Sequence, residues 1–385
     1  MSDSLTQNPA VEAANTAEKA WLTTLKITAL VYLLLLAVGM IGSGFKWASG
    51  GHAEELFAFA ANPFLALMIG IVATALVQSS STVTSIIVGL VAGGLPVTTA
   101  IPMIMGANIG TTVTNTLVSL GHVREKEAFK RAFSAATIHD FFNLLAVIIF
   151  LPLELAFGLL EKLSGWLVAP LNTDASLSLK EFNFIKPITK PVIGEAKGVL
   201  AAIPEPFGAV LMILAGIFII FFAITALGRV LKQSLTGRAK ELLHRAIGKG
   251  PLSGIASGTL VTVLVQSSST TTSLVVPLVG SNTLKVKDIY PFTLGANIGT
   301  CVTALLAATA ASGDFAAFAL QIALVHLLYN GLGVLLIYGL PFLRNLPLKG
   351  AEALGELAST RVPLAIGYVL AAFFLLPGAL IFLSQ

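Results

Sequence analysis

The chain has 385 residues, of which 56% are hydrophobic and 11% are charged. A soluble domain carries roughly 25% charged residues, so this composition excludes an ordinary soluble globular protein. Several apolar runs are long enough to cross about 30 Å of hydrocarbon, and they lack the alternation of membrane β-barrel strands. The basic residues behind the net charge of +4 lie in short loops, which is the positive-inside pattern and not a nucleic-acid footprint. We therefore expect an all-α polytopic membrane protein with no nucleic-acid partner.

The first part of the chain predicts a polar tail, residues 1–24, followed by a first membrane repeat, residues 25–160. The apolar run from Leu25 to Ile41 lacks the basic start and the cleavage site of a signal peptide, so we expect a retained span. No residue from Phe64 to Gly121 is charged, and this stretch is rich in Ser, Thr, Asn, Gly and Pro. Such a composition favours interrupted helices. A basic loop and a predicted span from Ala132 to Leu151 follow.

The order of these features recurs after a linker. Residues 161–206 carry ten charged residues and five prolines and contain no run long enough to cross a membrane. Residues 207–341 then repeat an apolar run, a basic loop that begins at Arg229, two uncharged stretches and a span from Phe315 to Leu340. Residues 342–385 add a loop and a last span, Pro363 to Leu383, which has no equivalent in the first half. The single cysteine, Cys301, excludes an intramolecular disulfide.

The recurrence is also visible residue by residue. The segment from Gln78 to Ser85 matches the segment from Gln266 to Ser273 at seven of eight positions. The Gly-Ala-Asn-Ile-Gly-Thr motif at 106–111 returns at 295–300 within a match of eight positions in nine. If both basic loops face the cytoplasm, the two halves are inverted in the membrane and the linker lies outside. The sequence therefore predicts two inverted-topology repeats whose interrupted or re-entrant helices meet near the bilayer midplane.

The two Gln-Ser-Ser-Ser motifs have the composition of an anion site. On an intact helix, consecutive residues point in different directions, so three adjacent serines face one ligand only at a break in the helix. A helix start leaves backbone N–H groups unpaired and directs positive potential at the gap. Hydroxyls and an amide add hydrogen-bond donors without adding charge. Ser and Thr also hold membrane helices together, but two copies in corresponding positions favour a site.

The Gly-Ala-Asn-Ile-Gly-Thr motifs have the composition of a cation site. Gly106 and Gly110 flank Asn108, which permits an unwound turn with free carbonyl oxygens. Neutral oxygens of this kind suit hard cations such as sodium. Asn297 is the counterpart of Asn108 in the second half, and for both residues hydrogen bonding between helices is the alternative.

Three titratable residues lie within the predicted spans. His139 and His326 are expected as interhelical donors, since no set of ligands for a transition metal surrounds them. Asp140 is the only charged residue inside the predicted core, so function is the default interpretation. Because that core contains no Lys or Arg, an oxyanion that enters it would need cations with it.

These motifs, together with the string from Phe129 to Asn143, resemble the type II sodium-dependent phosphate cotransporters. The resemblance implies sodium-coupled uptake of inorganic phosphate at the cell membrane, homodimers, and sodium as coupling ion with no further cofactor. In the family, Asp after this His marks the electrogenic members, so His139-Asp140 predicts electrogenic transport. Departures are the short linker and Cys301, which stands where the first repeat has Thr112 and puts equal use of the two motifs in doubt. The expected phosphate ligands are Gln78, Ser79, Ser80, Ser81, Gln266, Ser267, Ser268 and Ser269. The expected sodium ligands are Thr82, Asn108, Thr111, Thr112, Asn115, Asp140, Asn143, Thr270, Asn297 and Thr300.

Two alternatives remain at this point. The transported anion could be arsenate or sulfate, and protons could replace sodium. From another class, an intramembrane serine hydrolase could pair one of the serines with His139 or His326. The sequence contains no Gly-X-Ser-X-Gly elbow, and a mechanism with one nucleophile does not need duplicated serines.

Overall fold

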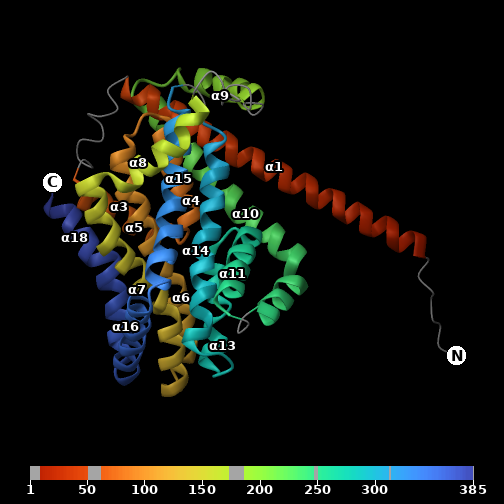
Figure 1. The fold of residues 1–385 in the computed structure, drawn as a ribbon. Helices are drawn as coiled ribbons and strands as arrows, with labels where there is room; N and C mark the ends of the chain where they lie inside the picture. The colour runs from red at the N-terminus through yellow and green to blue at the C-terminus, as the bar shows by residue number, and fades with distance from the viewer. Residues whose placement is uncertain (1–8, 51–61, 173–185, 247–249, 312–313, 385) are drawn as a thin grey trace.

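The structure is a computed structural model that describes residues 9–50, 62–172, 186–246, 250–311 and 314–384. Within these ranges the chain is almost entirely helical and contains no strand (Figure 1). Six described helical segments are long and apolar enough to cross a membrane. They are Trp21–Ser49, Lys126–Phe157, Phe207–Leu231, Val286–Ala308, Ala316–Tyr338 and Val362–Leu383. The chain is therefore an all-α polytopic membrane protein, as its composition predicts.

The uncharged stretch of the first half is a set of broken helices. α3 (Pro63–Val77) ends at Gln78, and α4 (Ser80–Ala92) begins after Ser79. The helix that contains the predicted span from Ala132 to Leu151 is longer than that span, and only Gly158 separates it from the first helix of the linker. The remaining elements of this part are α5 (Val97–Ile109), η2 (Gly110–Thr112), α6 (Val113–Ser119), η3 (Leu120–His122), α7 (Lys126–Phe157), α8 (Leu159–Val168) and η4 (Ala169–Asn172).

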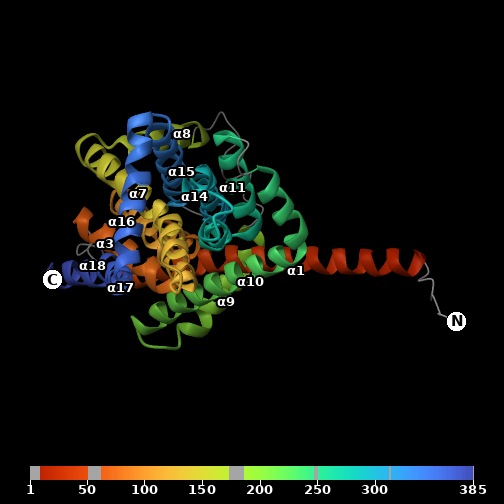
Figure 2. The same cartoon turned by 90° about the horizontal axis from the view of Figure 1, so that it is seen from below.

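Two long helices run side by side along one flank of the bundle. α1 (Pro9–Ser49) extends back into the segment predicted as a polar tail, and α10 (Phe207–Ala246) lies against it (Figures 1 and 2). Close contacts at Gly44 and Gly216 join the two helices. The basic segment that begins at Arg229 was predicted as a loop, and this prediction is wrong, because α10 continues as a helix. The segment is rich in Leu, Lys, Arg and Ala, which favour helix. α9 (Lys186–Leu200) of the linker packs across α1.

The second half repeats the break. α11 (Pro251–Val265) ends at Gln266, and α12 (Ser268–Ser273) begins after Ser267. The later spans contain π-helical turns, and the helix Pro341–Thr360 joins the second repeat to the last span. The elements that follow are α13 (Val276–Gly280), α14 (Val286–Ala308), α15 (Ala316–Gly333) with η5 (Val334–Tyr338), α16 (Pro341–Thr360), α17 (Val362–Leu370), η6 (Ala371–Leu375) and α18 (Leu376–Leu383).

The glycines of the Gly-Ala-Asn-Ile-Gly-Thr motifs bring helices close together. A Cβ on Gly106 would lie 2.0 Å from the carbonyl oxygen of Leu67, and a Cβ on Gly295 would lie 2.0 Å from that of Ile255. The predicted unwound turn is wrong in the second half, where α14 runs unbroken through the motif, and the first half shows only the 3-10 turn η2. Small residues serve here for backbone approach, as is common between membrane helices.

The glycine contacts also give the direction of the helices. Gly106 meets Leu67 and Gly110 meets Ile71, so α3 and α5 run parallel. Since α4 joins them in sequence, the chain turns back after α3, and α3 and α4 form a re-entrant hairpin. The same holds for α11 and α14, where Gly295 meets Ile255. In Figure 1 the α3 and α4 hairpin lies in the upper part of the bundle, whereas α11 and α13 lie lower. This placement is what inverted repeats would produce, and the orientation of the halves in a membrane stays a prediction.

Candidate functional site

Each hairpin tip has the same backbone geometry. Gln78 and Gln266 end their helices in the left-handed conformation, with φ of 57° and 55°. Their backbone N–H groups donate to the carbonyl oxygens of Thr74 and Thr262. A left-handed residue at a helix end is a common stop signal, although glycine is the usual occupant. A non-glycine residue in this conformation at both tips indicates that the glutamine side chain is needed there.

The serine after each glutamine starts the next helix. Ser79 and Ser267 are extended N-cap residues, and their hydroxyl oxygens accept hydrogen bonds from the backbone N–H of Thr82 and Thr270, each 3.2 Å long. These caps satisfy one free amide of each helix start. The hydroxyl hydrogens of both serines remain available to a ligand.

A threonine fixes the glutamine side chain in both halves. Thr114 donates to the amide oxygen of Gln78 at 2.7 Å, and Thr303 donates to that of Gln266 at 2.9 Å. The Gln266 amide nitrogen donates back to the Val263 carbonyl at 2.6 Å, and Gln78 makes the same type of bond. The sequence analysis did not predict these threonines as site residues. Both are the last residues of the matching segments at 106–114 and 295–303, so their recurrence in the repeat could have identified them.

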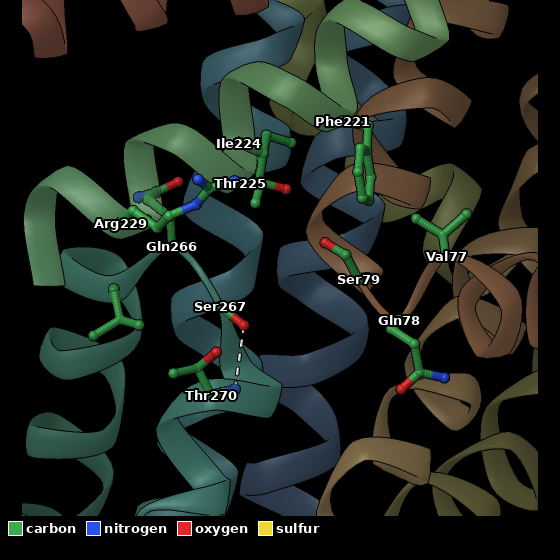
Figure 3. A pocket seen from close by; sticks show the side chains of 12 residues that line it. Val77, Gln78, Ser79, Phe221, Ile224, Thr225, Arg229, Gln266, Ser267 and Thr270 are labelled. Carbon is green, nitrogen blue, oxygen red and sulfur yellow. Dashed lines mark hydrogen bonds between the residues drawn. The ribbon is translucent and has the colours of Figure 1, made fainter.

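A cavity of about 350 Å³ lies between the two tips (Figure 3). Figure 3 shows Gln78 and Ser79 on one side, and Gln266, Ser267 and Arg229 on the other. Helix α10 closes the space with the apolar residues Phe221 and Ile224, with Thr225 and Gly228, and with Arg229. At about 30 Å³ per water molecule, the cavity has room for a small anion with part of its hydration shell. Its lining residues are Val77, Gln78, Ser79, Phe221, Ile224, Thr225, Gly228, Arg229, Val265, Gln266, Ser267 and Thr270.

The cavity separates the predicted phosphate ligands into two groups. Gln78, Ser79, Gln266 and Ser267 line it, together with Thr270, which we expected at a sodium site. The other four serines begin helices α4 and α12 and are buried away from it, with Ser269 donating to the carbonyl of Thr111 at 3.0 Å. The helix break precedes them, so the rotation of the helix turns them aside. This second group is Ser80, Ser81, Ser268 and Ser269.

Helix α10 contributes Thr225, Gly228 and Arg229 to the cavity, and our prediction missed all three. Arg229 places a cation beside a site that we expected to contain none. The predicted apolar run ends at Leu227, whereas α10 continues as a helix to Ala246. Arg229 is the first of a run of basic residues that includes Lys232 and Arg238, so the sequence alone assigns it to a cytoplasmic segment and gives no signal of a cavity.

Three of the predicted sodium ligands meet in one buried hydrogen-bonded chain. The amide nitrogen of Asn143 donates to the carbonyl of Asn108 at 2.8 Å, and Asn297 donates to the side-chain oxygen of Asn143 at 2.8 Å. His139 completes the chain, with its Nε2 atom 2.5 Å from the side-chain oxygen of Asn297. This hydrogen-bonded chain joins residues of both halves, and all its oxygen and nitrogen atoms are neutral. Neutral oxygen atoms are ligands that sodium prefers.

The corresponding residues of the second half differ. His326 and Asn330 are buried. Among the described residues, the two ring nitrogens of His326 have no hydrogen-bond partner, and the side-chain oxygen of Asn330 has none either. Asn330 instead donates to the sulfur of Cys301 at 3.6 Å. Cys301 donates to the carbonyls of Asn297 and His326, whereas Thr112, its counterpart in the first half, donates to the carbonyl of Ile109. The two motifs are therefore not equivalent in their contacts.

The remaining predicted sodium ligands lie in separate places. Asn115 exchanges hydrogen bonds with Thr272 across the two halves. The hydroxyl of Thr82 donates to Ser79 at the first tip. Buried threonine hydroxyls of the motifs donate to carbonyl oxygens of their own helix, which leaves their lone pairs free; these are Thr111, Thr112 and Thr300.

Asp140 lies apart from the asparagine chain and contacts the last span. Its Oδ2 atom accepts a hydrogen bond of 3.0 Å from the hydroxyl of Tyr368 on α17. Its Oδ1 atom is buried and has no hydrogen-bond partner among the described residues. A buried carboxylate oxygen without a partner is costly, which is typical of a site that receives a further ligand.

Comparison with known proteins gives consistent matches. Sodium-dependent phosphate transport protein 2A of Rattus norvegicus is 34% identical over 92% of this chain and 66% of its own length. The protein of the same name from Oryctolagus cuniculus is 33% identical, over 98% of this chain and 70% of its own length. Protein 2B of Homo sapiens is 31% identical, over 90% and 63%. The chain therefore spans about two thirds of the length of these relatives. No solved structure matches it.

The family model of the Na+/Pi-cotransporters matches residues 33–162 and 217–344. These two segments contain both hairpin tips, the part of α10 that lines the cavity and the asparagine chain. The last span, with Tyr368, lies beyond the match. From the duplicated motifs, their shared geometry and this match, the chain belongs to the Na+/Pi-cotransporter family.

Proposed function

We propose that this protein takes up inorganic phosphate together with sodium. The observation that carries this proposal is the cavity between the two hairpin tips, which both Gln-Ser pairs line. The hydroxyls of Ser79 and Ser267 offer neutral donors to a tetrahedral oxyanion from two sides, and each glutamine amide keeps one N–H besides the one that it donates to its own helix. Relatives that are named sodium-dependent phosphate transport proteins support phosphate as the anion and sodium as the coupling ion.

Sodium acts as the coupling ion at buried oxygen atoms inside the helix bundle, with no further cofactor. The chain of Asn108, Asn143 and Asn297 and the carboxylate of Asp140 supply oxygen atoms of the hardness that sodium prefers. A bound cation also lowers the cost of bringing a doubly charged anion into a region of low dielectric constant. Sodium and phosphate therefore bind with positive coupling.

Transport proceeds by alternating access and moves net positive charge inward. Residues of both halves and of α10 form the cavity, so a movement of one hairpin against the other would open it to one face at a time. Asp140 adds a negative charge inside the bundle, which would recruit one more sodium ion than phosphate alone requires. Net inward charge movement gains about 2.3 kcal/mol per 100 mV of membrane potential.

The protein works in the cell membrane as a homodimer in which each protomer transports. A single chain provides the whole lining of the cavity, which supports independent transport by each protomer. The hydrolase alternative has no support in the geometry, because Nε2 of His139 contacts Asn297 rather than a serine, and neither ring nitrogen of His326 has a hydrogen-bond partner among the described residues. Membership in a cotransporter family likewise identifies a transporter and not an enzyme.

Uptake of radiolabelled phosphate into proteoliposomes tests the proposal. An inward sodium gradient should drive accumulation, and an equal gradient of potassium or protons should not. Competition with arsenate and sulfate identifies the preferred anion. Uptake that is independent of sodium, or faster uptake of sulfate than of phosphate, would contradict the proposal.

A further inference from the structure

Arg229 is the first charged residue of α10 and lies at the end of the apolar segment that begins at Phe207. A cation within such a segment is costly, and it is usually retained for a substrate pathway or for contact with lipid headgroups at the membrane surface. The position of Arg229 near the end of the segment makes the second explanation an obvious competitor. The packing of α10 distinguishes the two.

Helix α10 meets the second hairpin at its tip. A Cβ on Gly228 would lie 2.8 Å from the carbonyl oxygen of Val265, the last residue of α11. α11 has 15 residues, so this contact is about 22 Å along the helix from the end where the hairpin begins. Arg229 follows Gly228 directly and therefore lies at the level of Gln266, deep along the hairpin. An arginine that only contacted lipid headgroups would not require α10 to pack against the tip of the second hairpin, so this packing favours the first explanation.

No described residue forms an ion pair with Arg229, but an anion bound in the cavity would lie beside it. Arg229 lines the cavity beside Gln266, and its side chain is exposed (Figure 3). The ion pairs among the described residues are those of Lys46 with Asp314 and of Lys130 with Glu356, so no described carboxylate neutralises Arg229. Every other residue that lines the cavity is uncharged. An unpaired guanidinium beside neutral donors is suited to an oxyanion, because its planar fork binds two oxygen atoms at once.

We propose that Arg229 binds the transported oxyanion in this cavity and makes the site selective for the doubly charged form. The proposal rests on the proposed function and adds a specificity residue from a helix outside both sequence motifs. The guanidinium compensates one of the two negative charges of the dianion, and the coupling cations compensate the rest. A singly charged anion gains less from the same contact, so it binds more weakly.

The test compares Arg229→Gln and Arg229→Lys with wild type in proteoliposomes. KM for phosphate is measured with a sodium gradient at one pH well below and one pH well above the second ionisation of phosphate. Phosphate-dependent thermal stabilisation of the detergent-purified protein gives a second readout that does not require transport. Arg361→Gln, which removes an exposed arginine that does not line the cavity, is the matched control.

We expect Arg229→Gln to raise KM roughly 10-fold at the higher pH, as the loss of one charged hydrogen bond implies, and to reduce the difference between the two pH values. Arg229→Lys should recover part of the affinity, since it keeps the charge and loses the fork. An unchanged KM and an unchanged stabilisation in Arg229→Gln would overturn the proposal. Reduced insertion with normal KM would also overturn it and identify a membrane anchor. If wild type shows no sodium-dependent uptake, the proposed function fails, whatever the variants do.

Discussion

The glutamine at each hairpin tip has one threonine partner, and this pairing makes the contribution of each half testable. Gln266 and Thr303 are buried, whereas Gln78 is exposed and Thr114 is partly exposed. Loss of a hydrogen-bond partner costs about 1 to 3 kcal/mol when the remaining atom is buried, and less when water replaces it. The two halves should therefore respond in the same direction but by different amounts.

We expect Gln78→Ala and Gln266→Ala each to nearly abolish phosphate uptake while the protein still inserts and dimerises. Thr114→Val and Thr303→Val should reduce uptake less, with the larger loss in Thr303→Val. Uptake per amount of reconstituted protein measures the effect. Thr309→Val is the control, because Thr309 bonds only to the carbonyl of Leu306 at the end of α14. Normal transport by either glutamine variant would contradict a site that both halves share.

A second residue-scale prediction concerns Asp140 and its partner Tyr368. Asp140→Gly should keep measurable uptake, lose the inward current that phosphate evokes in sodium, and lower the Hill coefficient for sodium. Tyr368→Phe removes only the hydrogen bond to Oδ2, so it should keep the current and shift the sodium concentration for half-maximal uptake. Simultaneous recording of current and tracer flux measures both effects. An unaltered ratio of charge to phosphate in well-expressed Asp140→Gly would show that Asp140 has a structural function only.

At the scale of elements, the sequence allowed us to predict the helix breaks but not the shape of the second motif. The duplicated Gln-Ser motifs are interrupted in both halves, as their polar composition in an apolar stretch implies. Glycine is compatible both with an unwound turn and with close helix packing, and composition does not distinguish the two. Only the partner helices, α3 and α11, show that packing applies here. Arg229 is not predictable as a cavity residue for a similar reason, since it begins a basic run in the sequence and only the packing of α10 against the second hairpin brings it to the cavity.

The packing function of the glycines predicts a large effect of one methyl group. Gly106→Ala and Gly295→Ala each place a Cβ 2.0 Å from a backbone carbonyl oxygen of the neighbouring helix, which no side-chain rotation relieves. Overpacking of this kind costs typically about 1 to 3 kcal/mol, so both variants should unfold at lower temperature in detergent. Gly367→Ala and Gly378→Ala, where a Cβ meets nothing within 4 Å, are the matched controls. Equal melting temperatures for all four variants would contradict the packing interpretation.

At the scale of the whole molecule, the arrangement of the hairpins connects the fold to transport. Two hairpins that enter from opposite faces and meet at one cavity give each face its own gate. The contacts of the structure show two re-entrant hairpins, but their relation to the faces of a membrane rests on the positions of the two basic segments. Gly280, at the end of the second hairpin, packs against His122 at the start of the first basic segment, so both belong to one end of the bundle.

Impermeant maleimide labelling of single cysteines tests this arrangement in intact cells. The background is Cys301→Ser, which retains a donor at the buried position. Thr98 follows the first hairpin and Thr283 follows the second, and both side chains are exposed. With the basic segment at 122–131 in the cytoplasm, Thr283→Cys should react only after the membrane is opened, and Thr98→Cys should react from outside. Glu125→Cys, in the basic segment itself, is the control for the cytoplasmic face and should behave as Thr283→Cys does.

Because the second hairpin packs against His122 in this segment, a reversed overall orientation would exchange the reactive positions and keep the halves inverted. Reaction of Thr98→Cys and Thr283→Cys from the same face would instead contradict the inverted repeats, and with them a cavity gated from two sides.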